Sequence, residues 1–189
     1  MKKSLGASAL IYPAPVWVIG TYDKDGRADA ATVAWGGICS SKPPAVAISL
    51  RKSRYTYDNI MERQAFTVNV PRSDQIVIAD YCGIVSGRNT DKFAAAGITA
   101  VKSDRVEAPC IKEFPMVIEC RLIGQIEVGV HVHFIGEILD VVVDESVLGR
   151  DGLPDILKIA PVIYAPENQA YYGVGKYLGR AFAMGKDLK

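Results

Sequence analysis

Long apolar runs are missing from this sequence of 189 residues. The chain begins with a charged Met-Lys-Lys, but Pro13 and Pro15 interrupt the apolar stretch that follows, so neither a signal-peptide core nor a membrane span is predicted. An excess of one charge is missing too, because 22 Lys and Arg residues stand against 21 Asp and Glu residues. Neither nucleic acid nor a membrane is therefore expected as a partner, and we expect a cytoplasmic protein.

Paired cysteines and additional metal ligands are also missing. The four cysteines lie far apart without any C-x-x-C spacing, which predicts buried free thiols in a reducing compartment. Two histidines, His131 and His133, share one face of a predicted strand, a spacing that suits a metal ion. No Cys or carboxylate is paired with them in the sequence, so we predict no metal site. The cysteines are Cys39, Cys82, Cys110 and Cys120.

Several motifs of nucleotide-binding and hydrolytic enzymes are absent. The sequence has no G-x-G-x-x-G between a strand and a helix, no P-loop and no G-x-S-x-G. A Rossmann enzyme, an NTPase and an α/β-hydrolase are therefore not indicated. The Asp and Glu residues show no spacing typical of acid–base pairs, so no side chain is assigned a catalytic role. If the protein is an enzyme, its chemistry is expected to belong to a cofactor.

The most informative stretch is residues 32–59, which read TVAWGG, ICSSKPPAVAISL and RKSRYTYDN. Two apolar runs flank a Pro43-Pro44 loop, and the second run leads into the cations Arg51, Lys52 and Arg54 just before a predicted helix. Cations, hydroxyls and the free N–H groups of a helix N-terminus together can hold a phosphate dianion. A solvated surface loop has the same composition, so both interpretations stay open.

The hydrophobic pattern predicts a mainly β fold in a single domain, residues 1–189. Asp23-Lys24-Asp25-Gly26 is typical of a hairpin turn, and Gly136 is expected to form a bulge. Six or seven strands that do not alternate with helices favour a small antiparallel β-barrel with peripheral helices. The predicted strands are 16–22, one ending at residue 35, 45–50, 65–70, 116–128, 131–143 and 161–164; the predicted helices are one ending at residue 63, 73–83 and 91–96.

Lys92 stands in the first turn of the last of these helices, which reads DKFAAA. The N-terminal end of a helix dipole repels cations, so a lysine is electrostatically unfavourable there. Either its ammonium group is simply solvated, or it serves a bound anion.

Five motifs occur in a characteristic order: ATVAWGGICSSKPPAVAISL, RKSRYTYDNI, FTVN, SGRNTDKFAAAGI and HFIGEI. Together they resemble the flavin reductase-like proteins with an FMN-binding split barrel of Greek-key type, and within them the flavoredoxin group. The resemblance implies FMN as the cofactor, with residues 32–35 lining the isoalloxazine and later residues holding and covering the ribityl phosphate. The implied cofactor-binding residues are Thr32, Val33, Ala34, Trp35, Ser49, Leu50, Arg51, Thr56, Ser86, Gly87, Asp91, Lys92, Phe93 and Tyr164.

The same resemblance implies a homodimer with FMN near the subunit interface, and NAD(P)H or a small iron–sulfur or haem protein as electron partner. One position departs from the family: flavin reductases often carry Gly-Asp-His where this chain has Gly129-Val130-His131. Loss of the acid disfavours efficient reduction of free flavin by NAD(P)H. We therefore expect an FMN redox protein that transfers electrons through a tightly bound flavin. The alternatives are an NAD(P)H-dependent FMN reductase and a non-catalytic flavin-binding module.

Overall fold

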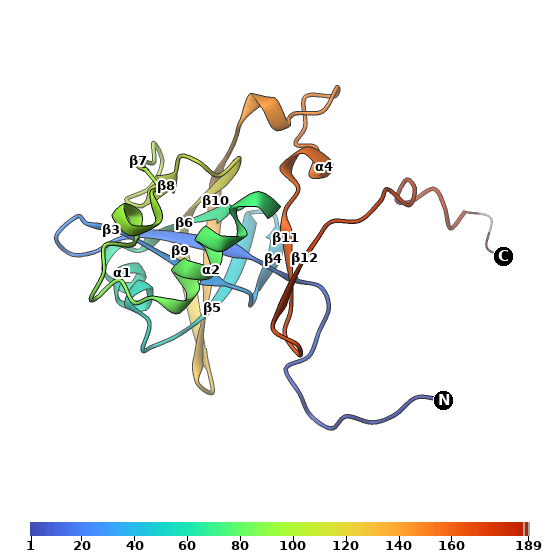
Figure 1. The fold of residues 1–189 in the computed structure, drawn as a ribbon, viewed down its shortest axis with the longest axis horizontal. Helices are drawn as coiled ribbons and strands as arrows, with labels where there is room; N and C mark the ends of the chain where they lie inside the picture. The colour runs from blue at the N-terminus through green and yellow to red at the C-terminus, as the bar shows by residue number, and fades with distance from the viewer. Residues whose placement is uncertain (187, 189) are drawn as a thin grey trace.

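The structure, a computed structural model, describes residues 1–186 and 188 (Figure 1). Its main sheet has seven strands in the order β3-β2-β6-β9-β10-β5-β4, and every neighbouring pair is antiparallel. The sheet curls so that β3 comes into contact with β5. Between β3 and β4, the carbonyl of Trp35 accepts a hydrogen bond from the amide of Ser49 on β5 over 2.8 Å. The strands are β2 (Trp17–Tyr22), β3 (Ala28–Val33), β4 (Gly36–Ser41), β5 (Pro44–Arg51), β6 (Ala65–Val70), β9 (Met116–Val128) and β10 (His131–Val143).

The turn between β2 and β3 forms where the sequence predicts it. Asp23 Oδ1 accepts hydrogen bonds from the backbone N–H groups of Asp25 and Arg27, both at 2.9 Å. Gly26 has φ +82°, a left-handed conformation that suits glycine. The turn therefore fixes the register in which β3 pairs with β2.

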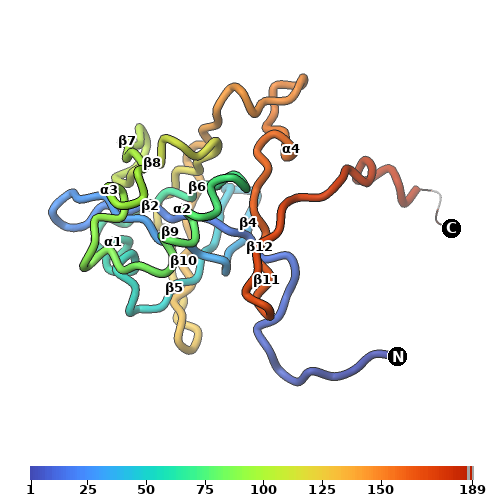
Figure 2. Tube along the Cα trace, in the orientation of Figure 1, coloured from blue at the N-terminus to red at the C-terminus, as the bar shows by residue number. Residues whose placement is uncertain are grey.

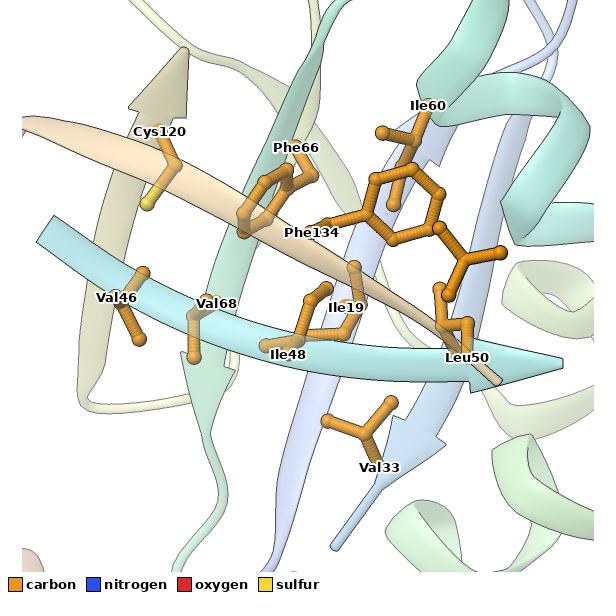
Figure 3. Close-up of a cluster of buried hydrophobic side chains, with 11 residues drawn as sticks. Ile19, Val33, Val46, Ile48, Leu50, Ile60, Phe66, Val68, Cys120 and Phe134 are labelled. Carbon is orange, nitrogen blue, oxygen red and sulfur yellow. The ribbon is translucent and has the colours of Figure 1, made fainter. Parts of the chain in front are cut away.

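The hydrophobic core lies inside the curled sheet, where side chains from β2, β5, β6 and β10 meet (Figure 3). Phe66 and Phe134 are fully buried at its centre. Gly136 makes this packing possible, because a Cβ there would come within 2.5 Å of Phe66 Cζ. The β9–β10 register also shifts between Ile135 and Gly136, so an irregularity occurs where the bulge was predicted. The extra residue, however, is Ile123 on β9 and not Gly136 on β10.

Three helices lie on the outside of the sheet, as the sequence predicts (Figure 1). They are α1 (Tyr55–Arg63), α2 (Ile76–Ile84), preceded by the short 3-10 turn η1 (Ser73–Gln75), and α3 (Lys92–Ala96). α1 packs mainly against β2, whereas α2 and α3 pack against β3. Gly97, with φ +65°, ends α3 and donates its N–H back into the helix. All three helices therefore surround the edge of the sheet formed by β3.

Several short elements escaped the sequence prediction. Strand β4 follows the first hairpin directly and pairs with β5, whereas we expected only a loop there. The predicted strand at 161–164 is β11 (Val162–Ala165), but it belongs to a separate small sheet with β1 (Ala14–Pro15) and β12 (Ala170–Gly173). The remaining elements are β7 (Ala100–Lys102), β8 (Pro109–Ile111), η2 (Glu145–Val147) and α4 (Ile156–Ile159).

The expectation that all four cysteines are buried is wrong for Cys39, which is exposed on β4. The register of β4 against β5 shifts between Ile38 and Ser40, so Cys39 is the extra residue of a bulge on an edge strand. Cys82 and Cys120 are buried, and burial raises the pKa of the Cys82 thiol to about 11. Cys110 is partly exposed.

Within the described residues, every helix is too short or too polar to cross a membrane. Figure 2 shows the two terminal segments leaving the body of the molecule on the side of the small sheet. The hairpin of β11 and β12 stands beside the main sheet, close to α2, in the same view.

Candidate functional site

A cleft of about 430 Å³ opens between the end of β3, α2 and the β11–β12 hairpin. Its volume lies within the range of roughly 300–1,000 Å³ that is usual for small-molecule sites. We call it the β3 cleft. Its lining consists of Val16, Thr32, Val33, Ala34, Trp35, Asp80, Gly83, Ile84, Tyr164, Gln169 and Tyr171.

Side-chain hydrogen bonds hold the sides of the β3 cleft together. The hydroxyl of Thr32 donates to the carbonyl of Ala79, which fixes α2 against β3. The hydroxyl of Tyr171 donates to Asp80 Oδ1 over 2.7 Å and so joins the β11–β12 hairpin to α2. Burial, together with this carboxylate, raises the pKa of Tyr171 above its usual value. Tyr171 therefore stays protonated and keeps donating at neutral pH.

A second, smaller cavity of about 160 Å³ continues along the same elements. It begins one residue away from the β3 cleft on both sides, because Ala31 precedes Thr32 on β3 and Val85 follows Ile84 at the end of α2. Its other side is the start of α1. We call this cavity the cup, and its lining consists of Ala31, Ser53, Arg54, Tyr55, Thr56, Val85, Ser86, Gly87 and Lys92.

The cup combines the three kinds of group that bind anions in proteins. The N-terminus of α1, a helix of nine residues, lies at the cup, because the N-cap Arg54 and the first residues Tyr55 and Thr56 are part of its lining. The first backbone N–H groups of a helix have no partner within the helix and are suited to an anion. Ser53 and Ser86 contribute hydroxyl groups. Arg54 contributes a guanidinium that also donates to the carbonyl of Gly83 over 3.0 Å. The cup therefore contains cationic and hydroxyl side chains, whereas the β3 cleft is lined by aromatic, aliphatic and uncharged polar side chains together with Asp80.

A buried ion pair lies beside the cup. Lys92 Nζ is 3.1 Å from Asp29 Oδ1, and both side chains are 3% exposed. The ammonium group also donates to the carbonyl of Ala30 and, over 3.4 Å, to that of Cys82. These bonds explain why a lysine is tolerated in the first turn of α3. Both interpretations of Lys92 from the sequence, a solvated ammonium group or one that serves a bound anion, left out Asp29.

Asp29 also fixes the hydroxyl of Thr56, which donates to Asp29 Oδ2 over 3.0 Å. An ionised carboxylate can only accept, so the hydroxyl proton must point at Asp29. On the side of the cup, the oxygen of Thr56 can then only accept hydrogen bonds. An anion in the cup would therefore need hydrogen-bond donors from other residues.

The loop that follows α2 fits tightly over the ion pair. A Cβ placed on Gly87 would overlap the Asp29 carboxylate and come within 3.0 Å of Tyr55 Cδ1. Arg27 donates to the carbonyl of Gly87 over 2.8 Å. The guanidinium of Arg88 lies 5.0 Å from the centre of the Tyr55 ring. Glycine at residue 87 therefore follows from the close approach of Asp29.

The structure gathers nine of the predicted cofactor-binding residues around these two cavities. Thr32, Val33, Ala34, Trp35 and Tyr164 line the β3 cleft, and Thr56, Ser86, Gly87 and Lys92 line the cup. These residues, which are distant in the sequence, come together because α1, α2 and α3 all lie near β3 at one edge of the sheet.

The other five predicted residues lie outside both linings. Arg51 is exposed at the end of β5, and Leu50 is buried in the main core. Asp91 is exposed and caps α3, whereas Phe93 packs in the core between α2 and β2. Ser49 faces a different groove. For all fourteen residues, a role in cofactor binding stays a prediction.

Four residues at or beside the cup are not among the cofactor-binding residues implied by the resemblance: Asp29, Ser53, Arg54 and Tyr55. Ser53 and Arg54 belong to the basic cluster that we noted, but the resemblance assigned them no role. Asp29 carried one signal, a lone carboxylate among alanines in a predicted strand. A buried strand position rarely holds an acid without a partner.

Another groove, of about 460 Å³, lies on a further side of Trp35, which lines this groove and the β3 cleft alike. His131 and His133 both face it, and His133 Nδ1 is hydrogen-bonded to Ser49 Oγ at 2.9 Å. In the part of the chain that the structure describes, no group of three or more His, Cys, Asp and Glu side chains is placed to hold a metal ion.

Comparisons with known proteins identify relatives of this arrangement. The model of the flavin reductase-like domain matches residues 9–173. Flavoredoxin of Desulfovibrio vulgaris (Miyazaki F) is 55% identical, with a TM-score of 0.95 over 98% of this chain and 100% of that chain. Flavoredoxin from Methanosarcina acetivorans is 33% identical, with a TM-score of 0.93 over the full length of both chains. The high molecular weight rubredoxin of Moorella thermoacetica is 26% identical over 78% of this chain and 59% of its own length.

Proposed function

This chain belongs to the flavin reductase-like domain family and is of the flavoredoxin type, as the sequence resemblance predicts, and on that premise we propose that it holds FMN as a prosthetic group and passes electrons through it. The mainly β split-barrel prediction is confirmed by the same comparisons. Family membership implies that the chain binds a flavin. That this flavin is FMN, and not FAD or riboflavin, is our proposal.

The observation that carries the proposal is the pair of adjoining cavities that differ in size and in the side chains that line them. The β3 cleft is the larger and has aromatic and aliphatic side chains in its lining, which suit a planar ring system. The cup, one residue further along β3, is small and is lined by cationic and hydroxyl side chains, which suit a single phosphate. FMN has this division of character, with a phosphate at the end of its ribityl chain. Riboflavin would leave the cup without an anion, and the adenosine diphosphate end of FAD would need more room than about 160 Å³.

Each group in this site has a physical task. Trp35 and Tyr164 contribute aromatic surface to the cleft, and the main chain of β3 contributes hydrogen-bonding groups to it. Ser53, Ser86, Arg54 and the N-terminus of α1 hold the phosphate. FMN, when bound, supplies a carrier for a hydride or for single electrons. The protein positions the cofactor and limits its contact with water.

We further propose that the functional unit is a homodimer. The far end of the β9–β10 hairpin exposes apolar side chains, with Ile126, Val128 and Val130 being 57%, 63% and 70% exposed. Exposed apolar side chains grouped on one hairpin are typical of an interaction surface. Light scattering of the FMN-loaded protein at micromolar concentration is expected to give twice the mass of one chain, and a monomer would contradict this part of the proposal.

The first experiment measures cofactor identity. The purified protein is expected to be yellow, with about one FMN per chain, and the apoprotein is expected to bind FMN at least about tenfold more tightly than riboflavin, the effect of one charge-assisted hydrogen bond or more. Fluorescence titrations with FMN, riboflavin and FAD give the three dissociation constants. Equal affinity for FMN and FAD would overturn the assignment.

The second experiment separates an electron carrier from an NAD(P)H-dependent reductase. The carrier interpretation expects slow reduction of the bound flavin by NADH or NADPH and faster exchange with a small iron–sulfur or haem protein. Stopped-flow absorbance under anaerobic conditions measures both reactions. Reduction by either nicotinamide faster than about 10 per second, the median turnover of enzymes, would favour the reductase. A flavin that exchanges electrons with neither kind of partner would favour a binding module.

A further inference from the structure

The Asp29–Lys92 pair connects the segments that line the cup. Asp29 lies on β3, Lys92 begins α3, and the carbonyl of Cys82 that accepts from Lys92 belongs to α2. Thr56, on α1, donates to the same carboxylate. Because both members of the pair are 3% exposed, water does little to screen the charge of either one.

The charge balance at the cup follows from this geometry. Lys92 is part of the cup lining, and its positive charge alone would attract a phosphate strongly. Asp29 Oδ1, only 3.1 Å away, offsets that charge. At the same time Asp29 Oδ2 accepts the hydrogen bond of the Thr56 hydroxyl, which could otherwise be donated to an anion. Both effects of Asp29 weaken the attraction for a phosphate.

We propose that Asp29 is an affinity-determining residue, which neutralises Lys92 and withholds the Thr56 proton, so that the phosphate is held by Ser53, Ser86, Arg54 and the N-terminus of α1. Lys92 then acts through Asp29 as a structural cation, and its ammonium group is not a direct phosphate ligand. The proposal rests on the proposed function, since it concerns the phosphate of FMN. Of the groups predicted from the sequence, it keeps Ser86, Arg54 and the helix start as phosphate ligands and removes Lys92 and Thr56.

Three variants distinguish this arrangement from direct binding by Lys92. Asp29→Asn leaves an uncompensated positive charge beside the cup, so FMN is expected to bind about tenfold more tightly. Lys92→Met leaves an uncompensated carboxylate, so FMN is expected to bind at least about tenfold more weakly. The double variant, Asp29→Asn with Lys92→Met, restores neutrality, and its FMN affinity is expected to return to within about threefold of the wild type.

The dissociation constants of FMN and riboflavin are measured by flavin fluorescence for each variant. Riboflavin, which lacks the phosphate, is expected to bind all three variants within about twofold of the wild type, because the β3 cleft is unchanged. A change in folding alone would alter both ligands together, so the ratio of the two constants reports on the cup. Asp58→Asn, which removes an exposed carboxylate of α1 that is paired with Arg88, is the matched control and is expected to leave the ratio within about twofold of the wild type.

Two results would overturn the proposal. A double variant that binds FMN as weakly as Lys92→Met would make Lys92 a direct phosphate ligand, and an Asp29→Asn variant that binds FMN more weakly would show that Asp29 supports the phosphate. If Lys92→Met fails to fold, Asp29→Asn and the double variant still decide. A wild type that binds FMN and riboflavin equally would instead overturn the proposed function, whatever the order of the variants.

Discussion

Replacing Gly87 with alanine tests whether the loop after α2 must lie directly on the Asp29 carboxylate. The added Cβ would overlap that carboxylate and approach Tyr55 Cδ1 to 3.0 Å, so either the loop or the ion pair has to move. Overpacking of this kind costs about 1–3 kcal/mol. For a chain of this length, each kcal/mol lowers the melting temperature by about 2–4 °C, so a decrease of about 2–12 °C is expected.

The same substitution is expected to affect FMN more than riboflavin. Gly87 lines the cup and not the β3 cleft, so displacement of the loop should weaken phosphate binding by about tenfold, equivalent to 1.4 kcal/mol, and leave riboflavin within about twofold. Thermal unfolding of the apoprotein and fluorescence titrations measure the two effects separately.

Gly37→Ala is the control for this experiment. Among the described residues, no atom lies within 4 Å of a Cβ added there, apart from its chain neighbours. Its effect on the free energy of unfolding is expected to stay within about 0.5 kcal/mol. A Gly87→Ala protein with wild-type stability and wild-type FMN affinity would refute the close packing of Gly87 on Asp29, and with it the geometry assigned to the cup.

Further predictions concern the cleft, the thiols and the turn between β2 and β3. Tyr171→Phe removes the hydrogen bond to Asp80 across the cleft, so FMN is expected to dissociate a few-fold faster in displacement kinetics, with a change of about 1 kcal/mol or less in stability; an unchanged dissociation rate would show that this bond does not control access. At pH 8, a maleimide is expected to label Cys39, which is exposed, and to spare Cys82, which is buried and whose pKa of about 11 keeps it a thiol. Mass spectrometry of the labelled native protein measures the order of labelling. Labelling of Cys82 before Cys39 would contradict the prediction. Although burial raises the pKa of Asp23, hydrogen bonds to its carboxylate outweigh that effect and hold the pKa below its usual value. The contribution of Asp23 to the free energy of unfolding is therefore present above about pH 4 and is lost as the pH falls through the lower folded-state pKa. In urea titrations, the difference in stability between wild type and Asp23→Asn should decrease in acid. A difference that does not change with pH would refute this prediction.

Much of the fold could be predicted because its signals are local. Asp23 and Gly26 form the expected turn because carboxylate caps and left-handed glycines act within a few residues. Gly97 ends α3 for the same reason. Strand β4 was missed because glycines and Pro43 surround a short apolar run, and only pairing with β5 makes that run a strand.

The site was predicted in part, and the limit has a physical cause. The hydroxyls and cations of residues 51–56, followed by a helix start, indicated a possible anion site in the sequence, although a solvated loop has the same composition. The side chains that pair with Lys92 and Thr56 could not be predicted in this way. Asp29 lies 63 positions before Lys92 and 27 before Thr56, and no spacing rule joins residues so far apart.

The sequence by itself determined the family, the antiparallel β architecture and the presence of a polar segment at the start of α1, since these depend on alternation, turn residues and motif order. Only the tertiary structure decided which side chains Lys92 and Thr56 meet, because both contact Asp29. Lys92 has the composition of an anion ligand, but folding places it 3.1 Å from Asp29, in a site where both charges are buried and offset each other. The formal charge of a residue can be read from the sequence. The electrostatic potential at a binding site depends also on the charged groups that folding places beside that residue.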